Sequence, residues 1–348
     1  MRVIYGSANL PNDVVKAGTV AGLGFFDGFH RGHALILGRV MEEALRRGAS
    51  SMLYTYMERP EKVIRGTDTP LLMSLEAKIR YLTERGLDIL CLEVFDSSYA
   101  KMSPESFVGD LLAARLNARA VVAGFNYTFG DRGSGDIDRL KQLGKCFGID
   151  IFIVPPLTMD NEVVSSTLIR KYIYEGDMER AARMLGRLYT VEGEVRPGRK
   201  IGRRIGFPTA NITIDPSQSL PANGVYLTVT RIDGILYPSV TNVGINPTVA
   251  EDADDGTTDV PGEADPPSRK THHPHPMHRH LLRLETHILD FNKEIYKKNI
   301  EVSFIRKIRE EIRFSSERQL AEQIAADISH ARQAFKTFGE DGPWISGI

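Results

Sequence analysis

The chain has 348 residues, of which 42% are hydrophobic and 26% are charged. Single hydrophobic cores rarely grow much beyond roughly 250 to 300 residues, so two domains are expected. Lysine and arginine number 44 against 45 acidic residues, a formal net charge of −1. This balance provides no field that would hold a polyanion, and we expect no nucleic acid partner.

The cysteine content and the hydropathy pattern indicate a soluble protein. Cys91 and Cys146 are the only two cysteines, and their neighbours are typical of small buried side chains rather than of a disulfide framework or a metal site. The first residues carry no long apolar run, and no stretch of about 18 apolar residues occurs that would span a membrane. We therefore expect a cytoplasmic protein without a targeting segment or membrane partner.

Short apolar runs alternate with helical patterns from Thr19 to about Arg187. The expected strands and helices are, in chain order, Val20–Phe26, His33–Arg47, Ser51–Tyr56, Leu75–Arg85, Ile89–Val94, Pro104–Leu116, Ala120–Gly124, Ile149–Val154, Ser165–Tyr174 and Met178–Leu188. This rhythm predicts βαβ units, and hence an α/β domain with a parallel sheet over residues 1–187.

The pattern changes from Tyr189 onward to short β-rich runs separated by Gly, Pro and Asn. Such runs lie at Tyr189–Val195, Gly224–Arg231 and Ile235–Asn242. They predict a small antiparallel β-barrel within a second domain, residues 188–348. Apolar residues at helical spacing over Ile300–Ile312 and Ser316–Phe335 predict C-terminal helices that pack against the barrel.

Residues 249–283 differ in composition from their surroundings. Acidic residues are followed by a run that holds His272, His273, His275, His278 and His280. These histidines suggest Zn²⁺ or Ni²⁺, but the interleaved prolines and the lack of cysteine argue against a defined tetrahedral site. We expect a solvated insertion in the second domain.

The segment from Gly24 to His33 carries the first chemical signal. It follows a predicted strand and opens a predicted helix, where backbone N–H groups at the carboxyl edge of a sheet bind anions. His30 and His33, with Gly32 between them, are spaced to hydrogen-bond one phosphate chain and to stabilise charge on a transferring phosphoryl group. The alternative is that the two histidines only cap a helix or bind adventitious metal.

Two later segments carry side chains that suit a ligand with phosphate groups and a planar ring. Asn126 stands between aromatic residues at the end of a buried strand, which favours a cradle for a planar ring, although core packing explains it equally well. Ser166 and Thr167 begin a predicted helix, with Arg170 one turn later. Their alternative interpretation is an ordinary helix cap with a surface arginine.

The second domain carries its own oxygen ligands. Thr209 and Asn211, two residues apart at a strand start, lie on one face and offer a hydroxyl and an amide oxygen to a hard cation such as Mg²⁺. Hydrogen bonds along a sheet edge are the competing interpretation. Glu285 lies in the alternating run Leu284–Phe291, where a carboxylate can accept a proton from a substrate hydroxyl or simply pair with a cross-strand Lys or Arg.

Taken together, these segments resemble the bacterial bifunctional riboflavin kinase/FAD synthetase family. The segments that hold His30, Asn126 and Ser166 resemble its adenylyltransferase module. That module belongs to the nucleotidylyltransferase superfamily and has a His-x-Gly-His signature. Four further segments resemble the kinase module in the expected order, namely Gly206–Asn211, Pro221–Tyr226, Asn242–Gly244 and Glu285–Phe291. Phe304–Phe314 resembles the closing helix of that module. The resemblance covers nearly the whole chain apart from residues 249–283.

The resemblance implies a Rossmann-like nucleotidylyltransferase domain followed by a kinase barrel, both using ATP as co-substrate with Mg²⁺. The implied catalytic residues are His30, His33 and Glu285, with Glu285 as the base that acts on the ribityl 5′-hydroxyl of riboflavin. Thr209 and Asn211 are implied metal ligands, and Asp27 would help to organise magnesium. The implied nucleotide-binding residues are Gly24, Asp27, Gly28, Asn126, Ser166, Thr167, Arg170, Gly206, Thr209 and Asn211.

One departure from the family pattern bears on function. The family has Thr-Phe-x-Pro-His-Pro where this chain has Thr55 to Pro60, so that Arg59 replaces the histidine. Arginine is a permanent bidentate phosphate donor, but it does not titrate near neutrality. The main prediction is that riboflavin is phosphorylated to FMN and FMN is adenylylated to FAD with release of pyrophosphate. The alternatives are a kinase with a weakened adenylyltransferase site, or a non-catalytic flavin- or nucleotide-binding regulator.

Overall fold

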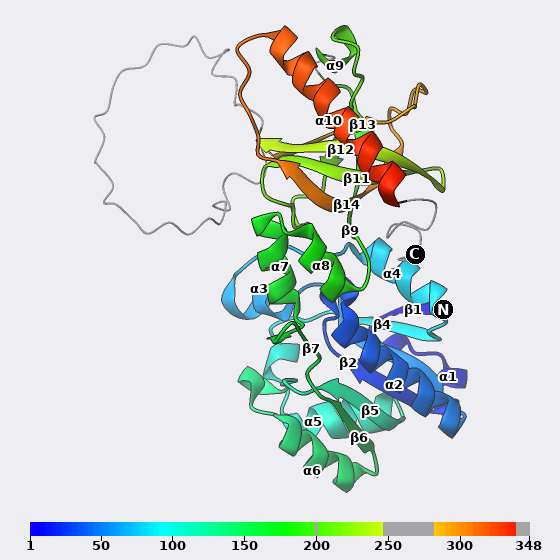
Figure 1. Cartoon of the computed structure of the whole chain (residues 1–348). Helices are drawn as coiled ribbons and strands as arrows, with labels where there is room; N and C mark the ends of the chain where they lie inside the picture. Colours follow the sequence, from blue (N-terminus) through cyan, green and yellow to red (C-terminus); the bar gives the residue numbers. More distant parts are fainter. Residues whose placement is uncertain (199–200, 246–281, 339–348) are drawn as a thin grey trace, which may run out of the picture. The chain divides into compact units, whose positions relative to one another are not determined.

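The computed structural model describes residues 1–198, 201–245 and 282–338, which form two compact units (Figure 1). Unit 1 comprises Met1–Lys171, Arg180–Arg187 and Ser217–Ser219, and unit 2 comprises Tyr172–Glu179, Leu188–Pro216 and the chain from Leu220 onward. The predicted insertion lies outside the described residues except for its last two positions. The predicted domain boundary after residue 187 stays a prediction.

A six-stranded parallel sheet forms the centre of unit 1. Its strands are β1 (Arg2–Tyr5), β2 (Thr19–Leu23), β3 (Ser50–Tyr56), β4 (Ile89–Glu93), β5 (Ala118–Gly124) and β6 (Asp150–Val154). Their order is β1-β4-β3-β2-β5-β6, and all neighbours are parallel. The chain moves outward from β2 in one direction through β3 and in the other through β5. The strand order therefore switches between β2 and β5, where ligands bind at the carboxyl ends of such sheets.

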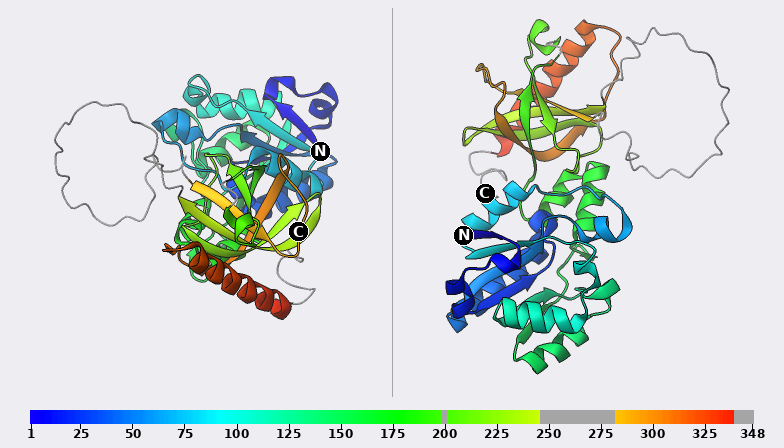
Figure 2. Two further views of the ribbon diagram at one scale, coloured as in Figure 1. Left: turned by 90° about the horizontal axis from the view of Figure 1, so that it is seen from above. Right: turned by 180° about the vertical axis from the view of Figure 1, so that it is seen from behind.

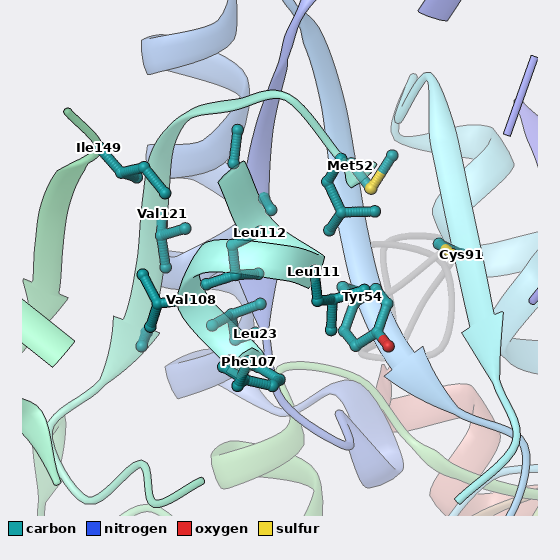
Figure 3. Packing of buried hydrophobic residues seen from close by; sticks show 14 of the residues in the cluster. Leu23, Met52, Tyr54, Cys91, Phe107, Val108, Leu111, Leu112, Val121 and Ile149 are labelled. Atoms are coloured by element: carbon teal, nitrogen blue, oxygen red, sulfur yellow. The ribbon is translucent and has the colours of Figure 1, made fainter. Parts of the chain in front are cut away.

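Helices cover both faces of this sheet. The helices in this part of the chain are α1 (Asn12–Ala17), α2 (Arg31–Arg47), α3 (Pro60–Arg65), α4 (Leu75–Glu84), α5 (Pro104–Ser106), the π-helical η4 (Phe107–Arg115) and α6 (Ile137–Phe147), of which α3 buries none of its residues. On one face, α2 and α4 contribute Val40 and Leu82 to a core with Leu53. Figure 3 shows the other core, where Leu111 and Leu112 of η4 meet the strands. Burial on both faces explains why the strands are continuous apolar runs.

The remaining elements of the first 187 residues are short or follow the sheet. The 3-10 turns are η1 (Ser7–Asn9), η2 (Asp27–Phe29), η3 (Tyr99–Lys101) and η5 (Asp131–Gly133). Strands β7 (Thr158–Met159) and β8 (Glu162–Val163) pair as a hairpin. Helices α7 (Ser166–Glu175) and α8 (Met178–Leu185) come next and contribute residues to both units.

Unit 2 contains a closed six-stranded antiparallel barrel. Its strands are β9 (Tyr189–Arg196), β10 (Ala210–Ile214), β11 (Gly224–Ile232), β12 (Ile235–Ile245), β13 (Leu282–Ile288) and β14 (Asn299–Arg309), in the order β10-β13-β12-β11-β14-β9. The short α9 (Ile201–Arg204) precedes β10, and α10 (Glu317–Phe338) ends the described chain. Ala331 of α10 and Leu227 of β11 belong to one buried hydrophobic cluster, and Figure 2 shows α10 along the outside of the barrel. The predicted fold class is confirmed.

The helix predicted over Ile300–Ile312 is wrong, because this segment forms strand β14 up to Arg309. Phe304–Phe314 is accordingly not a closing helix, and α10 takes that place. Burial of Ile300, Val302 and Phe304 alternates with partial exposure of the residues between them, which is the two-residue period of a strand. The interleaved charged residues mimicked an amphipathic helix.

Two smaller expectations also need correction. Cys146 is exposed, whereas Cys91 is buried as expected. Helix α6 buries Leu140, Leu143 and Gly144, so Cys146 lies off its apolar face. The edge strand β1 was not predicted.

Two glycines of unit 1 should respond in opposite ways to an added methyl group. A Cβ on Gly22 of β2 would lie 2.6 Å from the Leu53 side chain and 2.9 Å from that of Val40, whereas a Cβ on Gly38 of α2 meets nothing within 4 Å. Gly22→Ala should therefore destabilise unit 1 by about 1–3 kcal/mol through overpacking, and Gly38→Ala should stabilise it by about 0.5–1 kcal/mol. Thermal unfolding midpoints of the two variants test this; equal shifts would contradict the packing described.

Candidate active sites

The loop between β2 and α2 has an unusual backbone. Phe26, Gly28 and Phe29 all have positive φ, at 55°, 72° and 40°, although both phenylalanines are non-glycine residues for which this region is unfavourable. Both are buried, so packing enforces the conformation. A Cβ on Gly28 would lie 2.7 Å from the Leu72 side chain, and only glycine fits there.

His30 and His33 begin helix α2 and lie against each other. The His33 backbone N–H donates to Nδ1 of His30 over 3.3 Å, and the two rings stack with centroids 3.6 Å apart. Burial, together with the positive charges of Arg187 and Arg170, lowers the pKa of His30 to about 4. Burial and the neighbouring His30 also lower the pKa of His33 well below its ordinary value. Both rings are therefore neutral near pH 7.

One ring atom lacks a partner within the protein. Nδ1 of His33 is buried and has no hydrogen-bond partner among the described residues. A buried polar atom without a partner is costly, and a ligand would remove that cost. Gly32 permits the ring arrangement, because a Cβ there would lie 3.2 Å from the His30 ring.

The buried carboxylate of Asp27 connects the surrounding segments. Its Oδ1 accepts the Leu72 N–H over 2.9 Å, and its Oδ2 pairs with Arg170 of α7. Arg170 also donates to the carbonyl of Pro70 over 2.7 Å. Arg59 lies 3.5 Å from the same Oδ2. Both oxygens of Asp27 are thus engaged by the protein, an arrangement typical of a structural counterion.

Positive charge exceeds negative charge around this loop. Arg187 donates to the carbonyl oxygens of Gly28 and Phe29 over 2.6 and 3.1 Å. Burial lowers the pKa of Lys78 to about 8, with Asp27 opposing the shift and Arg59 adding to it. Nε of Arg59 is buried without a hydrogen-bond partner in the described part of the chain. Cations that outnumber their carboxylate favour a ligand with several negative charges, such as a triphosphate.

The start of helix α7 lies at the same loop. Ser166 Oγ donates to the backbone carbonyl of Asp27 over 2.9 Å, while Thr167 is exposed. The N-termini of α2 and α7 therefore converge on one region, and both ends favour anions. Asn126 is exposed directly after β5, the neighbour of β2, so it lies at the same edge of the sheet. Gly24 is anchored to this edge by its N–H, which donates to Tyr54 over 3.4 Å.

In unit 2, the turn before β10 is fixed onto β13. Gly206 has φ +92°, a conformation that favours glycine, and the Phe207 N–H donates to the Gly202 carbonyl over 2.7 Å. Nδ1 of His287 donates to the carbonyl of Pro208 over 2.8 Å. These contacts place Thr209 at the start of β10.

Strand register brings the predicted unit 2 residues together. Asn211 of β10 is the register partner of Glu285 on β13, and Glu285 is also the partner of Asn242 on β12. Cross-strand partners share a face of the sheet. The next residue, Thr286, is fully buried and hydrogen-bonds Thr241 over 2.9 Å inside the barrel. Glu285 and its two partners therefore form a row on the outer face.

These oxygen atoms fit a magnesium ion. Oδ1 of Asn211 is buried and has no hydrogen-bond partner among residues the structure describes, and Thr209 precedes it by two positions on the same face. Hydroxyl, amide and carboxylate oxygens are ligands for hard cations. No group of three His, Cys, Asp or Glu residues suited to a metal occurs within 1–198, 201–245 and 282–338.

Sequence reasoning missed two residues of the unit 1 site. Lys78 had a usable signal, because it lies three residues after Leu75 and four before Leu82, on the apolar stripe of α4. Arg187 had none, since its contacts with the loop depend on the return of the chain after α8.

Comparisons with known proteins agree with this geometry. The family model for FAD synthetase matches residues 13–168, and that for riboflavin kinase matches residues 185–335. The bifunctional riboflavin kinase/FMN adenylyltransferase of Pseudomonas fluorescens is 32% identical over 333 residues, covering 95% of this chain and 97% of the relative. The protein of that name from Escherichia coli K12 is 32% identical over 338 residues, covering 96% and 98%.

A solved structure shares the architecture along nearly the full length. The crystal structure titled as a macrolide-efflux protein from Streptococcus pneumoniae has a TM-score of 0.79 and 28% identity, covering 95% of this chain and 99% of that one. The word efflux in that title refers to the Streptococcus pneumoniae protein and not to this chain. Among the helices described here, none has the length and apolar character needed to cross a membrane.

The low pKa of His30 predicts a pH-dependent stability. Its pKa is about 4 in the folded chain against an ordinary 6.5, so the unfolded chain takes up a proton first as the pH falls. The contribution of neutral His30 to the free energy of unfolding is therefore fully present above pH 6.5, and it is lost progressively as the pH falls from 6.5 to 4. His30→Asn keeps a helix-capping acceptor but does not titrate. Its thermal midpoint should fall less over this range than that of the wild type; an identical fall would contradict the prediction.

Proposed function

The chain belongs to the bifunctional riboflavin kinase/FMN adenylyltransferase family, and from that premise we propose which residues make FMN from riboflavin and FAD from FMN. The proposal is carried by the buried polar atoms that have no hydrogen-bond partner among the described residues. Each unit has at least one such atom, of a type that suits a phosphate group or a phosphate-bound metal ion. In unit 1 these are His33 Nδ1 and Arg59 Nε, and in unit 2 the atom is Asn211 Oδ1.

In unit 1 we propose transfer of AMP from ATP to FMN. A phosphate oxygen of FMN attacks the α-phosphorus, the bond from that phosphorus to the oxygen bridging to the β-phosphate breaks, and pyrophosphate leaves with its electrons. His30 and His33 are neutral, so each ring carries one N–H that donates a hydrogen bond to a phosphate oxygen. Arg170 and Arg59 offset the charge that develops, and such fixed electrostatic stabilisation is usually the largest catalytic contribution.

In unit 2 we propose transfer of the γ-phosphoryl group of ATP to riboflavin. Glu285 takes the proton from the ribityl 5′-hydroxyl, and the oxygen of that hydroxyl forms the new bond to the γ-phosphorus. The bond from the γ-phosphorus to the oxygen bridging to the β-phosphate breaks, and ADP leaves with its electrons. Thr209 and Asn211 would hold Mg²⁺, which supplies charge neutralisation on the phosphates when bound. The register pairing of Asn211 with Glu285 places the base beside a metal ligand.

The two alternative functions find less support. A kinase with a weakened adenylyltransferase site was suggested by Arg59 in place of histidine. Arg59 nevertheless lies within the cationic cluster, 3.5 Å from Asp27 and over the Phe25 ring at 5.3 Å, so it adds a permanent charge there. No observation favours a non-catalytic regulator. Riboflavin, FMN, FAD and ATP are the proposed ligands, and we also propose a cytoplasmic location.

Replacing His30 should separate the two activities. His30→Asn keeps a cap for α2 but removes the imidazole, so FAD formation from added FMN and ATP should fall by about 10²–10³-fold. FMN formation from riboflavin should stay at the wild-type rate, because Glu285 and Asn211 lie in the other unit. Chromatography of the flavins in separate assays measures both. Parallel loss of both activities would contradict two independent sites.

Replacing Glu285 should give the converse result. Glu285→Gln should lower kcat for FMN formation by about 10²–10⁴-fold, the usual contribution of a positioned base, and should leave adenylylation of added FMN unchanged. Glu301→Gln on β14, which removes a partly exposed carboxylate paired with Arg231, is the matched control and should keep both activities. Wild-type kinase turnover in Glu285→Gln would exclude the proposed base.

A further inference from the structure

Lys78 is a buried cation on α4 whose amine contacts a backbone carbonyl and an aromatic ring. Its side chain is 5% exposed, and its Nζ donates to the carbonyl of Phe25 over 2.9 Å. Nζ also lies 4.7 Å from the centroid of the Phe25 ring. Among the described residues, no carboxylate lies within the 4.0 Å of an ion pair. Burying an ammonium group without an ion pair is costly, so its counterion has to come from elsewhere.

The carbonyl that Lys78 holds belongs to the strained phosphate-binding loop. Thr55 Oγ1 donates to the same Phe25 oxygen over 3.1 Å. A trans peptide is planar, with its C=O and N–H directed oppositely, and the structure contains no cis peptide among the described residues. Two donors on the carbonyl therefore turn the Phe26 N–H away from α4. No backbone carbonyl among the described residues accepts from that N–H, and Phe26 is one of the residues with positive φ.

The charge of Lys78 acts on the same site. It opposes protonation of His33 on α2, and it interacts with Asp27 and with Arg59, the residue before α3. The carboxylate of Asp27 already forms an ion pair with Arg170 and a hydrogen bond with the Leu72 N–H. Lys78 therefore interacts with this negative charge only at a longer distance, and Arg170 interacts with it too. A ligand with several phosphate groups would supply the missing negative charge.

We propose that Lys78 is a positioning residue for adenylyl transfer: it fixes the Phe25 carbonyl so that the Phe26 N–H faces a bound nucleoside triphosphate, whose phosphates neutralise its buried charge. This inference rests on the proposed function of the site around His30 and His33. Lys78 acts through the loop backbone and through its charge, and it forms no covalent bond with substrate.

Three substitutions separate the hydrogen bond from the charge. Lys78→Gln retains a donor for Phe25 but has no charge, Lys78→Arg retains both, and Lys78→Met retains neither. In assays of FAD formation from FMN and ATP, the Gln variant should lose about 10–100-fold in kcat/KM and the Met variant more. The Arg variant should recover most of the loss. A purely structural role predicts that Gln performs as well as Arg.

The pH profile provides a readout that a structural role would not change. Because the pKa of Lys78 in the ligand-free chain is about 8, the wild type should show a rising KM for ATP as the pH increases through 8, where Lys78 loses its charge. His33 stays neutral over this range, because its pKa lies well below the ordinary value, and Asp27 and Arg59 are the charged groups that also act on Lys78. The Arg variant should show a flat, low KM, and the Gln variant a flat, high KM.

The controls distinguish failure of this inference from failure of the proposed function. FMN formation by the same variants should match the wild type, because the proposed kinase site lies in unit 2, and recovery of FAD formation in Lys78→Arg shows that unit 1 tolerates a substitution at this position. Lys141→Gln on α6, a lysine with a half-exposed side chain near Asp138, should keep both activities. An active wild type with an equally active Lys78→Gln and an unchanged pH profile overturns the role of Lys78. A wild type that forms no FAD overturns the proposed function and this inference together.

Discussion

The interaction on which the N-terminal site depends is the ion pair between Asp27 and Arg170, both almost completely buried. It ties the loop after β2 to helix α7, and the Asp27 bond to Leu72 adds the segment before α4. Removing one partner would leave the other charge buried and uncompensated, a loss typically worth about 3–5 kcal/mol. The ion pair therefore places the N-termini of α2 and α7 at one position. The anion site is a consequence of that placement.

Local sequence signals predicted the parts of each site better than their connections. The glycines and histidines of the first loop could be predicted from the sequence, because their spacing allows few alternative interpretations. Gly28, for example, occupies a position that tolerates no side chain. The pairing of Asp27 with Arg170 joins residues far apart in the sequence, and no periodicity encodes it. Strand β14 was misassigned because its alternating burial is interrupted by register shifts after its first six residues, where charged residues follow.

The barrel site depends on register rather than on a buried charge. A shift of one residue between β10 and β13 would move Asn211 away from Glu285 and turn Glu285 toward the interior. The interior position next to it, Thr286, continues a buried row of hydrogen-bonded hydroxyls through Thr241 and Thr228. These directional bonds penalise a shift, since a displaced hydroxyl would lose its partner in a buried environment. The polar interior thereby helps to fix the outer row of Asn211, Glu285 and Asn242.

The two proposed sites differ in how they would neutralise phosphate, and their residues explain the difference. Unit 1 surrounds one carboxylate with arginine and lysine side chains, so the protein itself supplies positive charge to the ligand. The described row in unit 2 offers a hydroxyl, amide oxygens and the carboxylate of Glu285, all of which are neutral or negative. Such a row would repel a triphosphate unless a divalent cation lies between them. Dependence on Mg²⁺ should therefore be strongest where the base is a carboxylate, because that base and the phosphates carry charge of the same sign.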